Sequence, residues 1–144
     1  MNRDVEGQVG LPFEVRIETG KMAELSRCIG ATHEDHTLLE RPVMPPTFLT
    51  TMAFWEAAVV GSNPWPLLAM DVGRALHAEQ SYEFFGEPPR AGDRLIATSR
   101  IESITEKPSR RGTLTFAVMV TDFVDAETGH LVARARLTGV ETPA

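Results

Sequence analysis

The segment from Ala31 to His36 carries the densest group of side chains capable of acid-base chemistry. It contains His33, Glu34, Asp35 and His36 in an unbroken run. Histidine and carboxylate side chains exchange protons under mild conditions, so a pair of them can hold a water and move protons at neighbouring carbon atoms. A polar surface loop would have the same composition, because four such side chains in a row are readily solvated. Residue type alone leaves both interpretations open.

A metal site is the third interpretation of this run. His33, Asp35 and His36 are of metal-ligating types, but adjacent loop residues rarely converge on one ion. No distant ligand pair in the sequence completes a four-coordinate set. We therefore expect no metal and no cofactor.

A second candidate site lies where the chain enters its longest apolar segment. Pro45 and Pro46 cannot continue a helix backward, and Thr47 is a residue type that caps helices. The N–H groups that follow such a cap have no partner within the helix and can bind a ligand oxygen. Pro46, Thr47 and Phe48 are therefore predicted to bind substrate, although they would start a buried helix in any case.

A third candidate pair stands at the beginning of an alternating segment. Strand alternation predicts His77 and Glu79 on one face, with Ala78 and Gln80 on the other. A lone strand histidine is more often a hydrogen-bonded structural residue than a catalyst. We predict His77 and Gln80 as residues of a substrate tunnel or a subunit contact.

Two elements at the start of the chain precede these candidates. Residues 13–18 alternate between apolar and charged types, which is typical of a half-buried strand. Thr19 is then predicted to cap a short helix with apolar residues at helical spacing from Met22 to Ile29, ending at Gly30. Cys28 falls on the apolar face of this helix, so we expect it to pack rather than react.

The apolar segment over residues 47–60 predicts one long, well-buried helix that ends before Gly61. Its apolar stripe at helical spacing consists of Phe48, Met52, Trp55 and Val59. Beyond it, four long alternating segments predict strands: Ala75–Phe85, Arg94–Ile104, Thr113–Phe123 and Leu131–Val140. Short turns join them, the second at Lys107–Arg111, so the strands should pair antiparallel.

The element order predicts an α+β hot-dog fold, in which an antiparallel curled sheet of about five strands wraps around one long central helix. We expect a single domain over residues 1–144, because no linker or repeat divides the chain. The net charge of -6 argues against nucleic acid binding. The sequence has neither a signal peptide nor an apolar run of about 20 residues, and the single cysteine fits a reducing compartment. We therefore expect a cytoplasmic protein without membrane contact.

Four segments carry a resemblance to a known family: RCIGATHEDH, PPTFLTTMAFW, LHAEQSYEFF and EPPRAGDRL. They resemble successive landmarks of MaoC-like dehydratases, most closely the N-terminal MaoC-like domain and its stand-alone subunits. The resemblance covers Phe13 to Val140 and implies the hot-dog fold. It also implies hydration of trans-2-enoyl thioesters, or dehydration of 3-hydroxyacyl ones, on coenzyme A or acyl carrier protein.

Active members of that family carry the motif Gly-Asp-x-Asn-Pro-x-His. Laid on this sequence, the motif matches Gly30 and His36, but Ala31 takes the place of its aspartate. His33 and Glu34 replace its asparagine and proline. The resemblance thus implies a catalytic role for His36 and a missing carboxylate, for which Glu34 or Asp35 would substitute only if the loop were rebuilt.

Three functions follow from these observations. The first is a dehydratase or hydratase subunit whose activity depends on a homodimer or a heterodimer with another hot-dog subunit. The second is a non-catalytic subunit that binds or scaffolds acyl thioesters. The third is a hot-dog thioesterase, since some of these enzymes use a helix carboxylate and Glu56 lies on the predicted helix.

Overall fold

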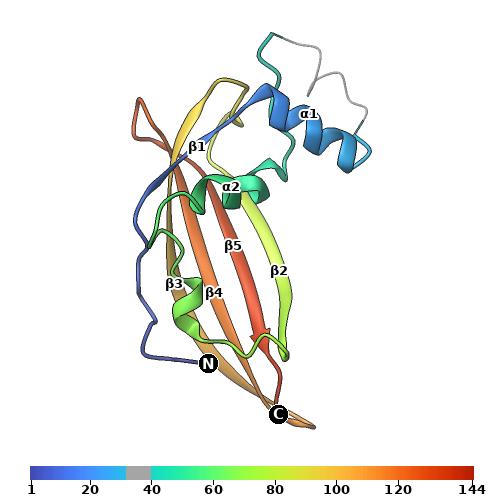
Figure 1. Ribbon diagram of the computed structural model, residues 1–144, viewed down its shortest axis with the longest axis vertical. Helices are drawn as coiled ribbons and strands as arrows, with labels where there is room; N and C mark the ends of the chain where they lie inside the picture. Colours follow the sequence, from blue (N-terminus) through green and yellow to red (C-terminus); the bar gives the residue numbers. More distant parts are fainter. Residues whose placement is uncertain (32–39) are drawn as a thin grey trace.

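The computed structural model describes residues 1–31 and 40–144. The run from His33 to His36, including the predicted catalytic His36, lies outside the described residues. The predicted architecture is confirmed in outline, because one curled antiparallel sheet wraps around short helical segments on its inner face (Figure 1).

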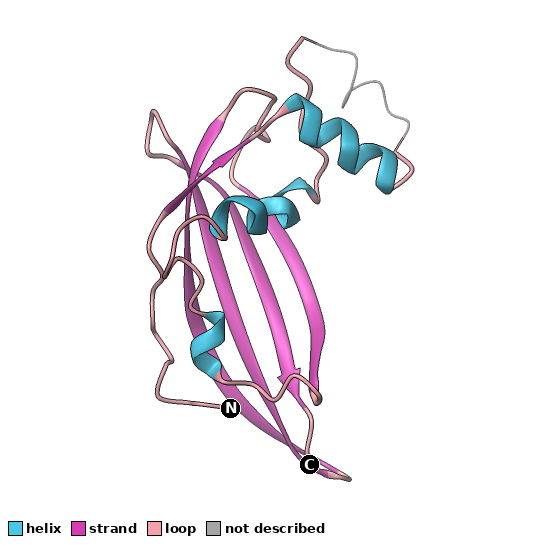
Figure 2. Ribbon diagram, viewed as in Figure 1, coloured by secondary structure: helices cyan, strands magenta, loops and turns pink. Residues whose placement is uncertain are grey.

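The sheet has five strands in the order β1-β3-β4-β5-β2, and every neighbouring pair is antiparallel. The predicted pairing of β2 with β3 is wrong, because β1 and β4 occupy the two sides of β3 and β2 pairs with β5 instead. Strand β1 is short and lies at one edge, whereas the long strand β2 forms the other edge. Figure 2 shows the helices on the concave side of the sheet and at one end of it. The strands are β1 Phe13–Arg16, β2 Ala75–Phe84, β3 Arg94–Ser109, β4 Gly112–Asp125 and β5 Leu131–Glu141.

The hairpin between β3 and β4 is longer than the sequence predicted. Pairing continues through Lys107 opposite Leu114 and ends with Ser109 opposite Gly112. The predicted turn at Lys107–Arg111 is therefore too long, because three of its five residues belong to β3. Only two residues remain to reverse the chain, and two-residue loops are the commonest connection in β-hairpins.

The long central helix is the main error in the predicted fold. Residues 47–60 contain instead a 3-10 helix, η2 Phe48–Met52, followed by a single turn of α-helix, α2 Ala53–Glu56. The Thr51 hydroxyl donates to the Phe48 carbonyl at 2.8 Å, and a threonine that bonds back to the preceding turn competes with the regular helical ladder. After α2, bonds from Ala58 to Trp55 and from Val59 to Glu56 tighten the chain into turns.

The first helix, α1 Thr19–Cys28, forms where the sequence predicted it, but two details differ. Glu18 occupies the N-cap position and no side chain caps the helix, so the predicted cap by Thr19 is wrong. Cys28 is exposed, so its predicted packing is also wrong. The buried side of α1 carries Met22 and Ser26, and a residue two positions beyond Ser26 lies about 200° around the helix.

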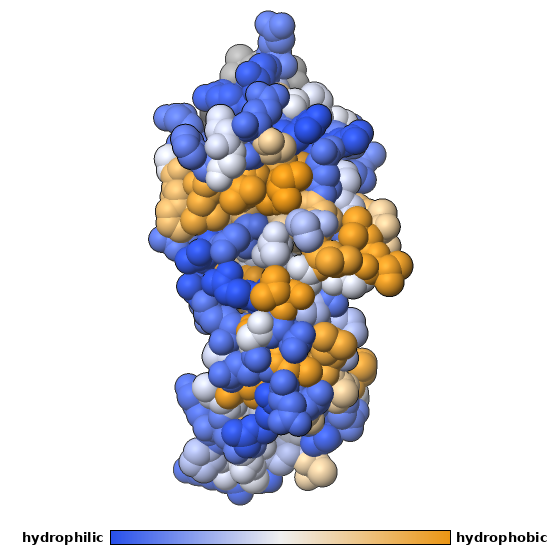
Figure 3. Space-filling model, turned by 90° about the vertical axis from the view of Figure 1, so that its left-hand side faces the viewer, coloured by the Kyte–Doolittle hydropathy of each residue, from blue (hydrophilic) through white to orange (hydrophobic). Residues whose placement is uncertain are grey.

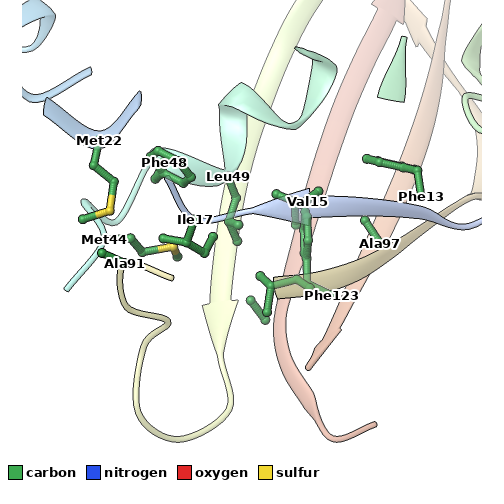
Figure 4. Close-up of a cluster of buried hydrophobic side chains, with 13 residues drawn as sticks. Phe13, Val15, Ile17, Met22, Met44, Phe48, Leu49, Ala91, Ala97 and Phe123 are labelled. Carbon is green, nitrogen blue, oxygen red and sulfur yellow. The ribbon is translucent and has the colours of Figure 1, made fainter. Parts of the chain in front are cut away.

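The main core lies between β1, η2 and the inner face of the sheet. In Figure 4 the side chains of Phe13, Val15 and Ile17 from β1 and its end lie among Phe48, Leu49 and Phe123. Alternation along β1 explains the arrangement, because every second residue of that strand points inward. The apolar stripe of residues 47–60 thus packs into the core as predicted, although its helix is short. Phe48 is fully buried, and Met52, Trp55 and Val59 are half-buried against the same core.

The outer surface mixes polar and apolar side chains. Figure 3 shows apolar side chains in several separate patches among hydrophilic ones on one face. The large apolar side chains that are exposed include Leu11, Phe54 and Val60. In the described part of the chain, no helix has the length and apolar character needed to span a bilayer.

Candidate functional site

A cavity of about 250 Å³ lies between the η2–α2 segment and the inner face of β2, β4 and β5. We call it the α2 cavity. Its apolar lining comes from Leu49, Met52, Ala53, Trp65, Met119, Ala135 and Leu137. Its polar lining comes from Thr50, Glu56, Asn63, His77, Gln80, Tyr82 and Thr121. A largely apolar hollow with a few polar groups is the usual form of a small-molecule site.

A β-bulge brings the two predicted strand residues into this cavity together. The register of β2 against β5 shifts between His77 and Glu79, so His77 lies opposite Gly139 and Gln80 lies opposite Leu137. Residues two apart on β5 point to the same face, so His77 and Gln80 also share a face. The prediction that they lie on opposite faces is wrong, because simple alternation does not account for the extra residue.

His77 and Gln80 form an exposed part of the cavity wall on the edge strand. The His77 Nε2 atom lies 3.1 Å from the Glu79 carbonyl oxygen, which can only accept a hydrogen bond. In the neutral imidazole, Nδ1 is then left as an acceptor. The Gln80 amide donates to the Arg136 carbonyl at 3.0 Å, which fixes its orientation.

Glu56 is a buried carboxyl in the wall of the cavity. Only 7% of the residue is exposed. One oxygen, Oε2, accepts a hydrogen bond from the Asn63 amide at 3.2 Å, but Oε1 has no partner among the described residues. Burial raises the pKa of Glu56 above its ordinary value, because the charged form loses hydration. The sequence drew attention to Glu56 only through a likeness to thioesterases.

The turn after α2 holds Asn63 in place beside Glu56. The Asn63 side-chain oxygen accepts a hydrogen bond from the Trp65 N–H at 2.9 Å. The Ser62 hydroxyl lies 2.9 Å from the Glu56 carbonyl and 2.7 Å from the Val59 carbonyl. These bonds tie the end of α2 to the turn, so the Asn63 amide is positioned before any ligand arrives. Nothing in the residue pattern of the turn indicated this role for Asn63.

Two other polar pairs in the cavity wall are already satisfied. The Thr121 hydroxyl pairs with the Ser99 hydroxyl at 2.8 Å, and the Thr50 hydroxyl pairs with the Tyr82 hydroxyl at 2.5 Å. Burial raises the pKa of Tyr82 and outweighs the opposing effect of its hydrogen bond to Thr50. Neither pair leaves a buried oxygen without a partner.

The predicted substrate-binding segment at Pro46, Thr47 and Phe48 lies outside the wall of the α2 cavity. Thr47 occupies the N-cap position of η2 but makes no capping bond, so that part of the prediction is wrong. The Phe48 N–H donates to the Pro45 carbonyl at 2.8 Å, and the Phe48 side chain is fully buried in the core. Pro46 and Thr47 are exposed, and their role toward substrate stays a prediction.

Ala31 follows the end of α1 and is the last residue described before the gap. It is half-buried, and its N–H donates to the Ser26 carbonyl at 2.9 Å. Within residues 1–31 and 40–144, no three His, Cys, Asp or Glu side chains gather in a way that could hold a metal ion.

A family model for the FAS1-like dehydratase domain region matches residues 7–135. The match includes β1 to β4, the η2–α2 segment and the first part of β5. The chain belongs to this dehydratase family. The FAS1-like dehydratase match thereby confirms the family resemblance read from the sequence.

Two relatives of the FAS1-like dehydratase chain are UPF0336 proteins from Streptomyces. The protein from Streptomyces griseus is 30% identical over 123 residues, covering 80% of this chain and 77% of the relative. The protein from Streptomyces coelicolor is 34% identical over 101 residues, covering 65% of this chain. That match spans 64% of the relative, which is less than two thirds of its length.

Solved structures share the fold of this FAS1-like dehydratase chain. The HadBC complex of Mycobacterium tuberculosis, a 3R-hydroxyacyl-ACP dehydratase, superposes with a TM-score of 0.73 at 23% identity, covering 97% of this chain and 99% of that one. A MaoC-like dehydratase from Phytophthora capsici gives 0.71 at 17% identity, with 98% and 50% coverage. At these identities the likeness establishes the fold alone, and it confirms the predicted hot-dog architecture.

Proposed function

We propose that this chain is a subunit of an enzyme that dehydrates 3-hydroxyacyl thioesters or hydrates trans-2-enoyl thioesters. The observation that carries the proposal is the match to a dehydratase family over residues 7–135. Coenzyme A and acyl carrier protein are the two candidate carriers. We propose a cytoplasmic location, in keeping with the single cysteine.

Dehydration requires a base that removes a proton from C2 and an acid that protonates the departing hydroxyl at C3. Hydrogen-bond donors must also stabilise the negative charge that develops on the thioester oxygen. We assign His36 to the acid-base pair on the family motif. Ala31 has no ionisable group and stands where the motif carries its aspartate. The missing carboxylate is therefore proposed to come from a partner subunit.

The apolar part of the acyl group is proposed to occupy the α2 cavity. At about 30 Å³ of liquid volume for a water-sized group, the cavity volume of about 250 Å³ corresponds to roughly eight non-hydrogen atoms. Burying apolar chain surface there would contribute about 25 cal/mol for each Å² removed from water. His77 and Gln80 would then contact the chain or the carrier at the exposed side of the cavity.

The partner is proposed to be a second hot-dog subunit, either another copy of this chain or a different one. The edge strand β2 is ten residues long, and most of its residues are exposed. A long open edge is a liability unless another chain covers it. The HadBC complex is itself built from different chains, which supports a heteromeric assembly.

Crotonyl-CoA hydration by the purified chain, alone and mixed with a hot-dog protein encoded by a neighbouring gene, tests this proposal. We expect negligible hydration by the chain alone and hydration by the mixture that exceeds that of the second protein alone. Absence of hydration with every such partner, and with carrier-protein thioesters in place of CoA, would contradict the proposal.

A thioesterase is the second candidate, because Glu56 places a carboxyl in the cavity wall. An acyl-CoA hydrolysis assay that measures the released thiol distinguishes a thioesterase from the dehydratase of the first proposal. Release that disappears in Glu56→Gln would support the thioesterase. Acyl-CoA binding with neither hydrolysis nor hydration in any mixture would indicate the third candidate, a non-catalytic acyl-binding or scaffolding subunit.

A further inference from the structure

Glu56 lines the α2 cavity and carries a buried polar atom that the fold leaves unsatisfied. Glu56 Oε1 has no partner among the described residues, whereas Oε2 is held by Asn63. Leaving such a group unpaired destabilises the fold, and more so when the group is charged. An apolar side chain at position 56 would avoid that cost and complete the apolar wall. A carboxyl in this place is therefore explained best by a ligand that pairs with it.

We propose that Glu56, positioned by Asn63, recognises a hydroxyl group carried on the acyl chain, away from the thioester. The ligand class is thus an acyl thioester with a hydroxyl at or near the end of a short chain. This inference rests on the proposed function, because it takes the occupant of the α2 cavity to be the acyl part of a thioester. It adds a substrate class that the family match does not specify.

A hydroxyl fits the carboxyl in either protonation state. An ionised Glu56 accepts a hydrogen bond from the hydroxyl, and a neutral Glu56 donates a hydrogen bond to the hydroxyl oxygen. A keto oxygen offers only an acceptor, and so pairs with the neutral form alone. Burial favours the neutral form of Glu56 without excluding the charged one. A hydroxyl can therefore form a hydrogen bond with Glu56 in both protonation states.

The remainder of the wall limits the chain to which that hydroxyl is attached. Leu49, Met119 and Leu137 present apolar surface, and the nearby hydroxyl pairs at Thr121 and Tyr82 are already engaged with their own partners. One buried oxygen without a partner, in a largely apolar cavity of about 250 Å³, suits one hydroxyl on a chain of roughly eight atoms.

Isothermal titration of the full chain with octanoyl-CoA and with ω-hydroxyoctanoyl-CoA tests the inference. We expect the wild-type chain to bind the hydroxylated thioester about tenfold more tightly, which corresponds to about 1.4 kcal/mol. Shorter and longer ω-hydroxyacyl-CoAs locate the chain length at which the preference is greatest. Glu56→Leu should reverse the preference, because the hydroxyl would then be buried without a partner.

Two further variants complete the design. Glu127→Gln changes a glutamate in the exposed turn before β5 and should leave the ratio of the two affinities unchanged. Leu137→Trp fills the cavity and should weaken both thioesters about tenfold or more, which places the occupant in the α2 cavity.

The outcomes separate this inference from the function on which it rests. If every hydroxylated thioester binds no better than its unsubstituted counterpart, and Glu56→Leu leaves that ratio unchanged, the inference is wrong and the acyl-binding function stands. If no acyl-CoA binds the wild-type chain and none is hydrated in a mixture with a partner, the proposed function fails and the inference fails with it.

Discussion

At the scale of single residues, the buried carboxyl of Glu56 should make the stability of the fold depend on pH. Its folded pKa is raised by burial, so the folded state holds the proton more strongly than the unfolded chain does. Its contribution is fully present below the unfolded pKa of about 4.3 and is lost as pH rises through the folded pKa. Stability relative to Glu56→Gln should therefore fall with rising pH.

Urea unfolding of the wild type and Glu56→Gln between about pH 4 and pH 8 measures this difference. His77 and Tyr82 are the other titratable groups that line the cavity, and both remain in the variant, so their contributions largely cancel. Glu127→Gln serves as the exposed control. If the wild type instead becomes more stable relative to Glu56→Gln as pH rises, the carboxylate must have a partner in the folded state.

The missing family aspartate leads to a second prediction at this scale. Ala31→Asp should place a carboxylate next to the helix end that holds the Ala31 backbone through Ser26. If His36 is the other member of the pair, crotonyl-CoA hydration by the chain should rise about tenfold or more, within the range of acid-base contributions. His36→Ala added to Ala31→Asp should remove the gain.

The opposite result is equally informative about these residues. Efficient hydration by the wild-type chain alone, abolished by His36→Ala, would contradict the need for a partner's carboxylate. Glu34 or Asp35 would then be the second group. Full activity in His36→Ala would instead show that the family motif is misplaced on this sequence.

At the scale of elements, the short η2–α2 segment should contribute to stability chiefly through one aromatic side chain. Phe48 is fully buried in the main core, whereas Trp55 is half-buried against it with ring centroids 6.4 Å apart. Phe48→Ala should cost about 3–5 kcal/mol, and Trp55→Ala clearly less, because less of the indole leaves water on folding. Thermal or urea unfolding compares the two, and a larger loss for Trp55→Ala would contradict the observed burial.

Contact between β5 and the 3-10 helix η3 Trp65–Leu68 leads to a further prediction. A Cβ added at Gly139 would lie 2.6 Å from the Trp65 ring, so the ring must move. Trp65 lines the α2 cavity. Gly139→Ala should therefore shift the tryptophan fluorescence and weaken octanoyl-CoA binding. Gly20→Ala, where the new Cβ meets nothing within 4 Å, is the matched control, and equal effects in both variants would contradict the contact.

At the scale of the whole molecule, the open edge of the sheet predicts association. Strand β2 has β5 on one side and no neighbouring strand on the other in the described chain. Light scattering should give at least twice the 15.9 kDa mass of one chain. When a partner is supplied, it should give at least the combined mass of the two chains. A monomer at micromolar concentration, unchanged by any hot-dog partner, would contradict the paired assembly.

The sequence by itself determined the strand content, the antiparallel pairing of β3 with β4 and of β4 with β5, and the family. It did not determine the neighbour of β2, which is β5 and not β3. Alternation over residues 13–18 and over the last four strands is a local signal, because each side chain's face depends on its position along the strand. It located the first and last residues of β2 and β5 to within one position. It also identified His77 and Gln80, which do line the cavity.

The tertiary structure decided how those residues meet. The bulge after His77 depends on pairing with β5, a strand more than fifty residues away along the chain. The local alternation of residue types does not indicate it. The replacement of the predicted long helix by η2 and α2 depends on the competing bond from the Thr51 hydroxyl to the Phe48 carbonyl and on packing against the sheet. Burial of Glu56 results from tertiary packing, so its unpaired oxygen could be identified only once the fold had removed it from water.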